Sequence, residues 1–324
     1  MWSRRALLTG TAALGGCSLR GFPFTTRHGS PGSGLSLTYF TVGCSLISHG
    51  GVSVLTDPFW SHLPLGRVLF GPVVPDPTQV EPMLPATLSQ VQAVVVGHGH
   101  YDHVMGLPEV VDRLSPSAQV IAGRSVANTY APMGLTRSFV HAENHLSTPT
   151  TRGEPIELPG LRVWPLRSGH PPQWAFFHGW RKDLDQPART APHRLKHYQE
   201  GQPLAYLLDF LAPDGAVAKR VFVETSSTGL PAGLPPDSLR DRPVDLAMVS
   251  MDVARAAARG SETILDVLQP PEVVFCHWEN FFRSRDKPPR EAVKVHLRQL
   301  RRDLPDSPQR THYFPMWGAQ LHFS

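Results

Sequence analysis

The stretch Val91-Gln92-Ala93-Val94-Val95-Val96-Gly97-His98-Gly99-His100-Tyr101-Asp102-His103 decides the fold of this chain. Its first half is a short, nearly continuous apolar and β-branched run, which is typical of a strand buried on both faces. Its second half holds three histidines and an aspartate close together. Proteins of the α/β class carry active sites where such strands end, and imidazole is the commonest metal ligand. The stretch therefore predicts a metal site at the carboxyl end of a buried strand.

The spacing within this motif suits two ions rather than one. His98 and His100 are two residues apart, so in an extended loop their side chains point to the same side and can bind one ion. The turn that follows directs Asp102 and His103 toward a second ion. Gly99 removes side-chain bulk between the first two ligands. Packing alone does not require so dense a set of ligand residues, so we interpret the motif as metal-binding.

Strands and helices are expected to alternate around this motif, as in an α/β fold. A hairpin is expected from two alternating runs, 35–40 and 52–55, and the Pro-rich passage from Asp57 to Pro85 is expected to be a loop. Further strands are expected at 118–122, 161–166, 204–210, 220–223, 245–250 and 273–275, and helices at 104–114, from Ser261 to Pro270, and at 290–304. Residues 171–203 interrupt the alternation and are expected to form a surface insertion over the site.

The first residues are typical of an export signal. Arg4 and Arg5 precede a short apolar stretch, residues 6–16, that is too short to span a bilayer, and this order resembles a twin-arginine signal. The string ending in Cys17 resembles a lipobox, whose cysteine becomes the lipidated first residue. We therefore expect residues 1–16 to be an export signal that is removed. Residues 17–34 are then a lipidated cysteine and a flexible tether, and the mature protein is lipid-anchored to a membrane on the periplasmic side.

Composition excludes several classes of protein. Hydrophobic residues make up 41% and charged residues 18%, which fits neither a disordered chain nor a coiled coil. The formal net charge is +4, and two of these charges lie in the export signal, so no nucleic-acid partner is expected. Besides Cys17 the chain has only Cys44 and Cys276. They could pair in an oxidising compartment, but two buried thiols are the favoured interpretation.

The motif from His98 to His103 resembles the His-x-His-x-Asp-His signature of the metallo-β-lactamase fold superfamily. Thr56-Asp57-Pro58 and His277-Trp278 more closely resemble the branch that contains N-acyl-phosphatidylethanolamine phospholipase D and ascorbate-6-phosphate lactonase. The resemblance covers residues 35–324. It implies an αββα sandwich with two divalent metal ions, expected to be zinc, at one edge of the two sheets. It also implies a third histidine on the first metal, a bridging carboxylate, and a last histidine on the second metal.

Carried over to this sequence, the resemblance assigns the two remaining histidines. The third ligand of the first metal falls on His170, which follows the strand expected at 161–166. The alternatives for this ligand are His141, His145 and His178. His277, directly after an apolar strand, is assigned to the second metal, with a core histidine as its alternative.

The bridging carboxylate and the outer residues match the family less closely. The family's Gly-Asp-Thr turn corresponds to Val223-Glu224-Thr225, so the longer Glu224 is expected to bridge the ions, with a solvent-facing or ion-paired Glu224 as the alternative. Asp57 resembles an aspartate of the family that lies behind the metal ligands and holds a ligand or a water by a hydrogen bond, although Asp before Pro also initiates turns. Gly43-Cys44 stands where the branch often has Gly-His.

These residues together predict a metal-dependent hydrolase. Two divalent ions lower the pKa of a shared water from about 15.7 toward about 7, which supplies metal-bound hydroxide for attack on an ester or phosphodiester. Asp102 is expected to be catalytic, because it holds one ion and orients the nucleophile. The leaving group is expected to take its proton from a metal-bound water, His178 or Tyr101.

The substrate is expected to be a small molecule or a lipid. A phospholipase D-like phosphodiesterase fits the membrane tether and the aromatic residues of the insertion. The alternatives are a lactonase of the ascorbate-6-phosphate lactonase type and a non-enzymatic metal-dependent binding protein. A di-iron redox protein of this fold usually carries Glu where His100 stands, so His100 argues against that class.

Overall fold

Two β-sheets pack on each other in the computed structural model, which describes residues 19, 21–32, 34–135, 139–171, 182–305 and 307–324. The export signal at residues 1–16, Cys17 and His178 lie outside the described residues. Among those described, no helix is long and apolar enough to cross a bilayer.

The first sheet has eight strands in the order β1-β15-β2-β3-β4-β5-β6-β7. Their bounds are β1 Thr25–His28, β2 Leu35–Thr41, β3 Cys44–His49, β4 Val52–Thr56, β5 Val91–Val95, β6 Gln119–Ala122, β7 Phe139–His141 and β15 Pro315–Phe323. The second sheet has seven strands in the order β14-β13-β12-β11-β10-β9-β8. Their bounds are β8 Ile156–Leu158, β9 Leu161–Arg167, β10 Leu204–Leu211, β11 Val217–Glu224, β12 Leu246–Ser250, β13 Glu272–Cys276 and β14 Thr311–Tyr313.

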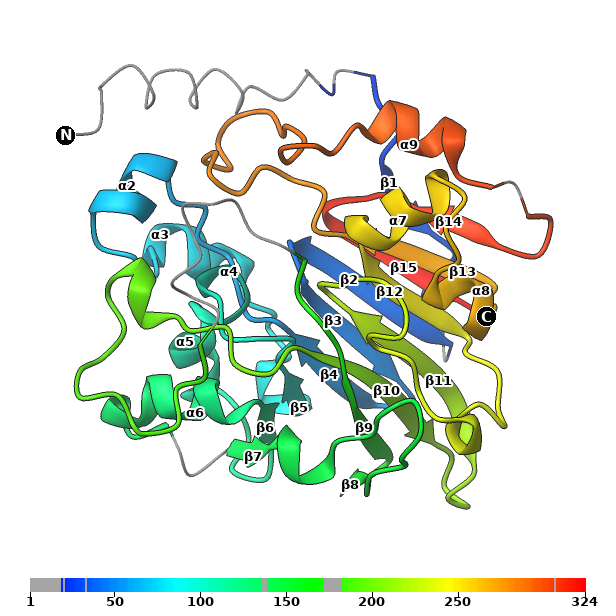
Figure 1. The fold of residues 1–324 in the computed structure, drawn as a ribbon, viewed down its shortest axis with the longest axis horizontal. Coiled ribbons are helices and arrows are strands. Elements are labelled where there is room, and N and C mark those ends of the chain that lie inside the picture. Colours follow the sequence, from blue (N-terminus) through cyan, green and yellow to red (C-terminus); the bar gives the residue numbers. More distant parts are fainter. Residues whose placement is uncertain (1–18, 20, 33, 136–138, 172–181, 306) are drawn as a thin grey trace.

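Helices lie on both sides of this pair of sheets, with α2 to α6 on one side and α7 to α9 on the other (Figure 1). Their bounds are α2 Leu65–Phe70, α3 Pro77–Val80, α4 Tyr101–Val104, α5 Leu107–Val111, α6 Arg124–Tyr130, α7 Met251–Ala258, α8 Ile264–Leu268 and α9 Leu297–Asp303. Short 3-10 turns are Glu81–Met83, Leu88–Gln90, Ala131–Met133, Ala142–His145, Leu195–His197 and Asp237–Leu239. The predicted fold class, an αββα sandwich, is confirmed.

Strand β5 explains how the deciding stretch builds this sandwich. Ala93 and Val95 belong to the core between the two sheets, whereas Val94 and Val96 belong to the core beneath α4 to α6. All four side chains are almost fully buried. The alternation of a strand therefore uses both faces of the apolar run, as predicted.

Parallel pairing brings several strand ends to one edge of the sandwich. In the first sheet β4 runs parallel to β5, and in the second sheet β11, β12 and β13 run parallel to one another. Because β9 and β11 are both antiparallel to β10, β9 ends at the same edge as β11. The predicted ligands follow three of these strands: the loop from His98 to His103 follows β5, His170 follows β9, and His277 follows β13.

The structure corrects three expected elements at the start of the domain. The opening hairpin is a meander, because β3 lies between β2 and β4 and pairs with both. The Pro-rich passage holds the short helices α2 and α3. The helix expected at 104–114 is only α5, and α4 already ends at Val104, since the backbone N–H of Gly106 donates to the carbonyl of Pro58 at 2.9 Å. A Cβ at Gly106 would lie 2.8 Å from the ring of Trp60, so this close approach interrupts the helix.

The later helices differ as well. The helix expected to begin at Ser261 is α8, which begins at Ile264. Before it, Thr263 and Asp266 form a capping box, in which the Thr263 N–H donates to Asp266 Oδ2 at 2.8 Å. The helix expected at 290–304 is only α9, because Lys294 adopts a φ of 66° that no helix tolerates. Helices α6 and α7 and strands β1, β7, β8, β14 and β15 were not predicted, and β1, which pairs with β15, lies within the residues 17–34 that were expected to include a flexible tether.

Candidate metal centre

The predicted ligands other than Glu224 meet at one edge of the two sheets because each follows a strand end. Asp57 follows β4, and the loop from His98 to His103 follows β5. His170 follows β9, and His277 follows β13. Residues far apart in the sequence are thus brought into two groups that could each hold a metal ion.

The first group consists of His98, His100 and His170, whose candidate ligand atoms all lie within 4.8 Å of one another. The Nε2 atom of His98 is 2.8 Å from Nδ1 of His100. The Nδ1 atom of His170 is 2.8 Å from the carbonyl oxygen of Pro171, and since a carbonyl only accepts, Nδ1 carries the proton. With the proton on Nδ1, Nε2 is the ligand atom that His170 can offer to an ion.

The second group consists of Asp102, His103 and His277, with candidate ligand atoms again within 4.8 Å. Asp102 Oδ2 lies 3.4 Å from Nε2 of His277 and 3.7 Å from Nε2 of His103. His277 has a φ of 62°, a strained left-handed conformation, and its N–H donates to the carbonyl of Val42 at 2.9 Å. The backbone is therefore bent at the point where the His277 side chain turns into the group.

Asp57 connects the first sheet to the second group. Its Oδ1 accepts a 2.6 Å hydrogen bond from the N–H of Gly97, and its Oδ2 lies 2.8 Å from Nδ1 of His103. The proton is therefore on Nδ1 of His103. Its Nε2 is buried and has no hydrogen-bond partner among the described residues. An orphaned imidazole nitrogen beside a carboxylate fits a bound cation.

The electrostatics of the two groups also suit a divalent ion. Burial, together with the neighbouring imidazoles, lowers the pKa of His98 well below its usual range, and burial lowers the pKa of His170 to about 4. Both histidines are therefore neutral, which is the form that binds metal. Burial favours protonation of Asp102, but the charges of His103 and His277 outweigh it and hold the pKa of this carboxyl well below its usual range. Imidazoles and a carboxylate are ligands that zinc takes; in the second group burial is outweighed by the hydrogen bond and charge of Asp102, which raise the pKa of His277, whose proton a bound ion would displace.

The structure places Glu224, predicted to bridge the ions, in neither group. Its Oε1 accepts a 2.6 Å hydrogen bond from the hydroxyl of Ser168, and burial raises the pKa of its carboxyl to about 8. Because side chains alternate along a strand, the next residue, Thr225, takes the opposite direction. A Cβ added at Gly97 would lie 2.5 Å from the Thr225 hydroxyl oxygen. The bridging prediction for Glu224 therefore lacks support, and Thr225 is the residue of this turn that lies beside the loop leading to the ligands.

The other candidates are also placed. His141 ends β7 and His145 lies in the next 3-10 turn, and neither belongs to a group of potential ligands. His178 lies outside the described residues. Cys44 and Cys276 are both free and buried, which confirms the two buried thiols. A side chain on Gly43 would collide with the carboxylate of Asp57, so glycine is required there.

Glu279 is a residue of the site that the sequence reasoning missed. Its fully buried carboxylate accepts hydrogen bonds from the Tyr39 hydroxyl at 2.9 and 2.8 Å, and from the Thr41 hydroxyl at 2.8 Å. It also accepts from the Val42 N–H at 2.7 Å. The same Val42 holds the backbone of His277 through its carbonyl, so Glu279 supports the second group. Its place two residues after the ligand His277 was the only signal in the sequence.

Comparisons with known proteins agree with this fold. The family model described as "Beta-lactamase superfamily domain" matches residues 53–278. Igni18, a metallo hydrolase from Ignicoccus hospitalis, superposes with a TM-score of 0.52 at 17% identity, covering 90% of this chain and 98% of that one. A possible metal-dependent hydrolase from Veillonella parvula gives a TM-score of 0.52 at 13% identity, covering 90% and 100%. At these identities the likeness concerns the fold alone.

Two further comparisons add context. An isothiocyanate hydrolase from Delia radicum gut bacteria superposes with a TM-score of 0.51 at 13% identity, covering 89% of this chain and 99% of that one. Uncharacterized proteins of Mycobacterium tuberculosis and Mycobacterium bovis are 38% identical over 74 residues. That match spans 22% of this chain and only 18% of each relative's length.

Proposed function

This chain belongs to the beta-lactamase superfamily, and from that premise we propose that it is a metal-dependent hydrolase of the metallo-β-lactamase fold that cleaves a phosphodiester with two zinc ions. The observation that carries the proposal is that the two ligand groups are adjacent. The ring centroids of His98, in the first group, and His103, in the second, are 4.0 Å apart. Two adjacent divalent ions, when bound, activate water and polarise the bond that is cleaved.

The residues of the two groups have different roles around the ions. The three histidines of the first group offer imidazole nitrogens as ligands, and burial keeps His98 and His170 neutral. Asp102 supplies the negative charge of the second group and an acceptor that orients the attacking water. Asp57 keeps the proton of His103 on Nδ1, so that Nε2 is directed to the ion.

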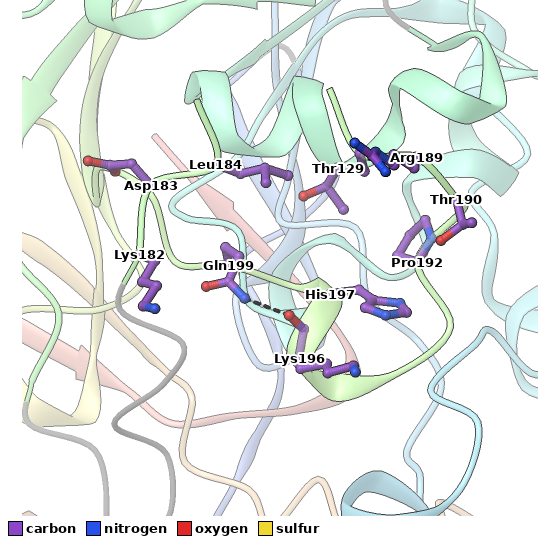
Figure 2. A pocket seen from close by; sticks show the side chains of 11 residues that line it. Thr129, Lys182, Asp183, Leu184, Arg189, Thr190, Pro192, Lys196, His197 and Gln199 are labelled. Carbon is purple, nitrogen blue, oxygen red and sulfur yellow. Dashed lines mark hydrogen bonds between the residues drawn. The ribbon is translucent and has the colours of Figure 1, made fainter. Parts of the chain in front are cut away.

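A basic cavity, formed by residues between Lys182 and Gln199 together with Thr129, supports an anionic substrate, although none of the ligand residues lines it. The cavity has a volume of about 350 Å³, and Figure 2 shows Lys182, Arg189, Lys196 and His197 around it, with Asp183 as the one acidic residue among those that line it. Its wall includes Gln199, whose neighbour Glu200 lies 3.7 Å from Nε2 of His100. Cations in a concave site attract negatively charged substrates. A phosphodiester meets this requirement. The resemblance of this chain to the branch with N-acyl-phosphatidylethanolamine phospholipase D supports the same proposal.

Turnover of a substrate panel by the zinc-loaded protein tests this function. We expect a phosphodiester to give a higher kcat/KM than a carboxylic ester, a lactone or a β-lactam, and we expect a chelator to abolish turnover until zinc is restored. The Arg189→Ala variant should raise KM for the phosphodiester, whereas Arg259→Ala, an exposed arginine after α7, should not. Preference for the lactone would instead support the lactonase, and two bound ions without any turnover would support the binding protein.

The proposal includes an exported, membrane-anchored enzyme with a lipid or small-molecule substrate. Its support is the order of Arg4-Arg5, the apolar stretch and Cys17 in the sequence. We expect the wild-type protein to partition with membranes and Cys17→Ala to release it, with Ser18→Ala as the matched control. A wild-type protein that stays in the cytoplasm with Met1 retained would contradict the anchor.

A further inference from the structure

Glu200 lies against two histidines of the first group, although it comes from the segment expected to be a surface insertion. Its Oε2 atom is 3.7 Å from Nε2 of His100 and 3.8 Å from Nδ1 of His170. The residue is 9% exposed, so its carboxylate is largely removed from solvent. A buried carboxylate acts on nearby N–H groups more strongly than an exposed one, because water screens it less.

Glu200 faces the outer nitrogen of each ring. In His100, Nδ1 is the atom directed at His98 Nε2, so the Nε2 that faces Glu200 is on the other side of the imidazole. In His170, the Nδ1 that faces Glu200 is the atom that donates to Pro171, which leaves Nε2 for an ion. The carboxylate therefore contacts the two nitrogens that are not needed as ligands.

The backbone places Glu200 through bonds to the ligand loop itself. The N–H of Gly99 donates to the carbonyl of Glu200 at 2.9 Å, and the N–H of Leu204 donates to the carbonyl of Gly97 at 2.7 Å. A Cβ at Gly99 would collide with the carbonyl oxygen of Gln199. Position 99 therefore requires glycine because the backbone at Gln199 approaches so closely. This is a stronger reason for glycine than the removal of side-chain bulk between His98 and His100. Any movement of the ligand loop would carry Glu200 with it.

We propose that Glu200 is a positioning residue of the first metal group, the counterpart of Asp57 in the second. Its negative charge, at ion-pair distance from both rings, favours the tautomers in which His100 and His170 carry protons on their outer nitrogens, with the His170 proton donated to the carbonyl of Pro171. The remaining nitrogen of each ring is then directed toward the ion. Outer carboxylates of this kind typically change metal affinity about 10–100-fold. The inference rests on the metal binding in the proposed function, but not on the substrate.

Metal titration separates this role from a structural one. With zinc and a competing chelator, we expect Glu200→Ala to weaken one of the two ions about 10–100-fold and to leave the other unchanged. Glu200→Gln, which keeps one acceptor oxygen, should recover part of the loss. With cobalt(II) in place of zinc, the absorption bands of the weakened site should shift in Glu200→Ala. The matched control is the Glu157→Ala variant. Glu157 is an exposed residue of β8 that is paired with Arg162 of β9, so this variant should bind both ions as the wild type does.

Two results would overturn the inference. The first is Glu200→Ala protein that binds both ions with wild-type affinity and an unchanged cobalt spectrum. The second is an equal loss at both sites together with a lower unfolding temperature of the metal-free variant, which would make Glu200 structural. Since the readout is affinity, wild-type protein that binds two ions but cleaves nothing would refute the proposed function and leave the role of Glu200 intact.

Discussion

The Nδ1 atom of His103 lies 2.8 Å from Oδ2 of Asp57, a residue 46 positions earlier in the chain. The other oxygen of the same carboxylate accepts the N–H of Gly97 at 2.6 Å. One side chain thus ties the end of β4 both to the start of the ligand loop and to a ligand near its end. This arrangement fixes the tautomer of His103 and the course of the loop together.

Replacing Asp57 should therefore weaken the second ion more than the first. In Asp57→Asn the amide can still contact one partner, but it cannot accept from both Gly97 and His103 with charged oxygens. We expect the affinity for one ion to fall about 10–100-fold, measured by zinc titration against a chelator. The exposed Asp112→Asn variant is the control. If Asp57→Asn binds each ion with the same affinity as the wild type, the contact between Asp57 and His103 does not support the site.

The Asp102→Asn variant should lose hydrolysis while it stays folded. The amide is nearly isosteric with the carboxylate, but it lacks the negative charge for the second cation and the acceptor that aligns the attacking water. We expect turnover to fall by about 10² or more. Circular dichroism checks the fold, and turnover of the substrate that the wild type cleaves checks the chemistry. Substantial remaining turnover would mean that the hydrolytic centre does not lie at His98 to His103.

Glu224 should make the stability of the protein depend on pH. Burial raises the pKa of its carboxyl to about 8 in the folded chain, whereas the unfolded value is close to about 4.3. Between these values the unfolded state binds fewer protons than the folded state, so stability is greatest below the lower value and falls as pH rises toward 8. The slope is at most about 1.4 kcal/mol per pH unit. Glu224→Gln should lack this loss, so its advantage over wild type should grow with pH.

Urea unfolding of the metal-free proteins at several values between pH 5 and 8 measures this difference. The denaturation midpoints of wild type and Glu224→Gln should diverge steadily as pH rises. A constant difference over the whole range would mean that Glu224 is ionised in the folded protein and that burial does not control its pKa.

Glu279→Gln should destabilise the fold and loosen the second group. The amide offers a single acceptor oxygen to the donors Tyr39, Thr41 and Val42, and its NH₂ group faces at least one of them. Hydrogen bonds to charged groups contribute about 1.5–3 kcal/mol each, so we expect the free energy of unfolding to fall by about that amount or more. Urea denaturation measures it, with the exposed Glu262→Gln as control. An unchanged denaturation midpoint would refute the role assigned to this carboxylate.

The sequence by itself predicted the strand that ends in the ligand loop, because both features are local. An apolar β-branched run and closely spaced histidines can be recognised without knowledge of any other part of the chain. The same holds for His277, which directly follows an apolar strand. The family resemblance then supplied the αββα arrangement, which the structure confirms.

Only the tertiary structure decided which way neighbouring side chains point and which distant residues meet. Glu224 and Thr225 are adjacent in sequence, yet one packs against Ser168 and the other against the ligand loop, because side chains alternate across the strand. Glu200 reaches the first group because backbone hydrogen bonds join its segment to Gly99. Register and backbone contact over long separations determine these placements, and a local sequence pattern carries neither.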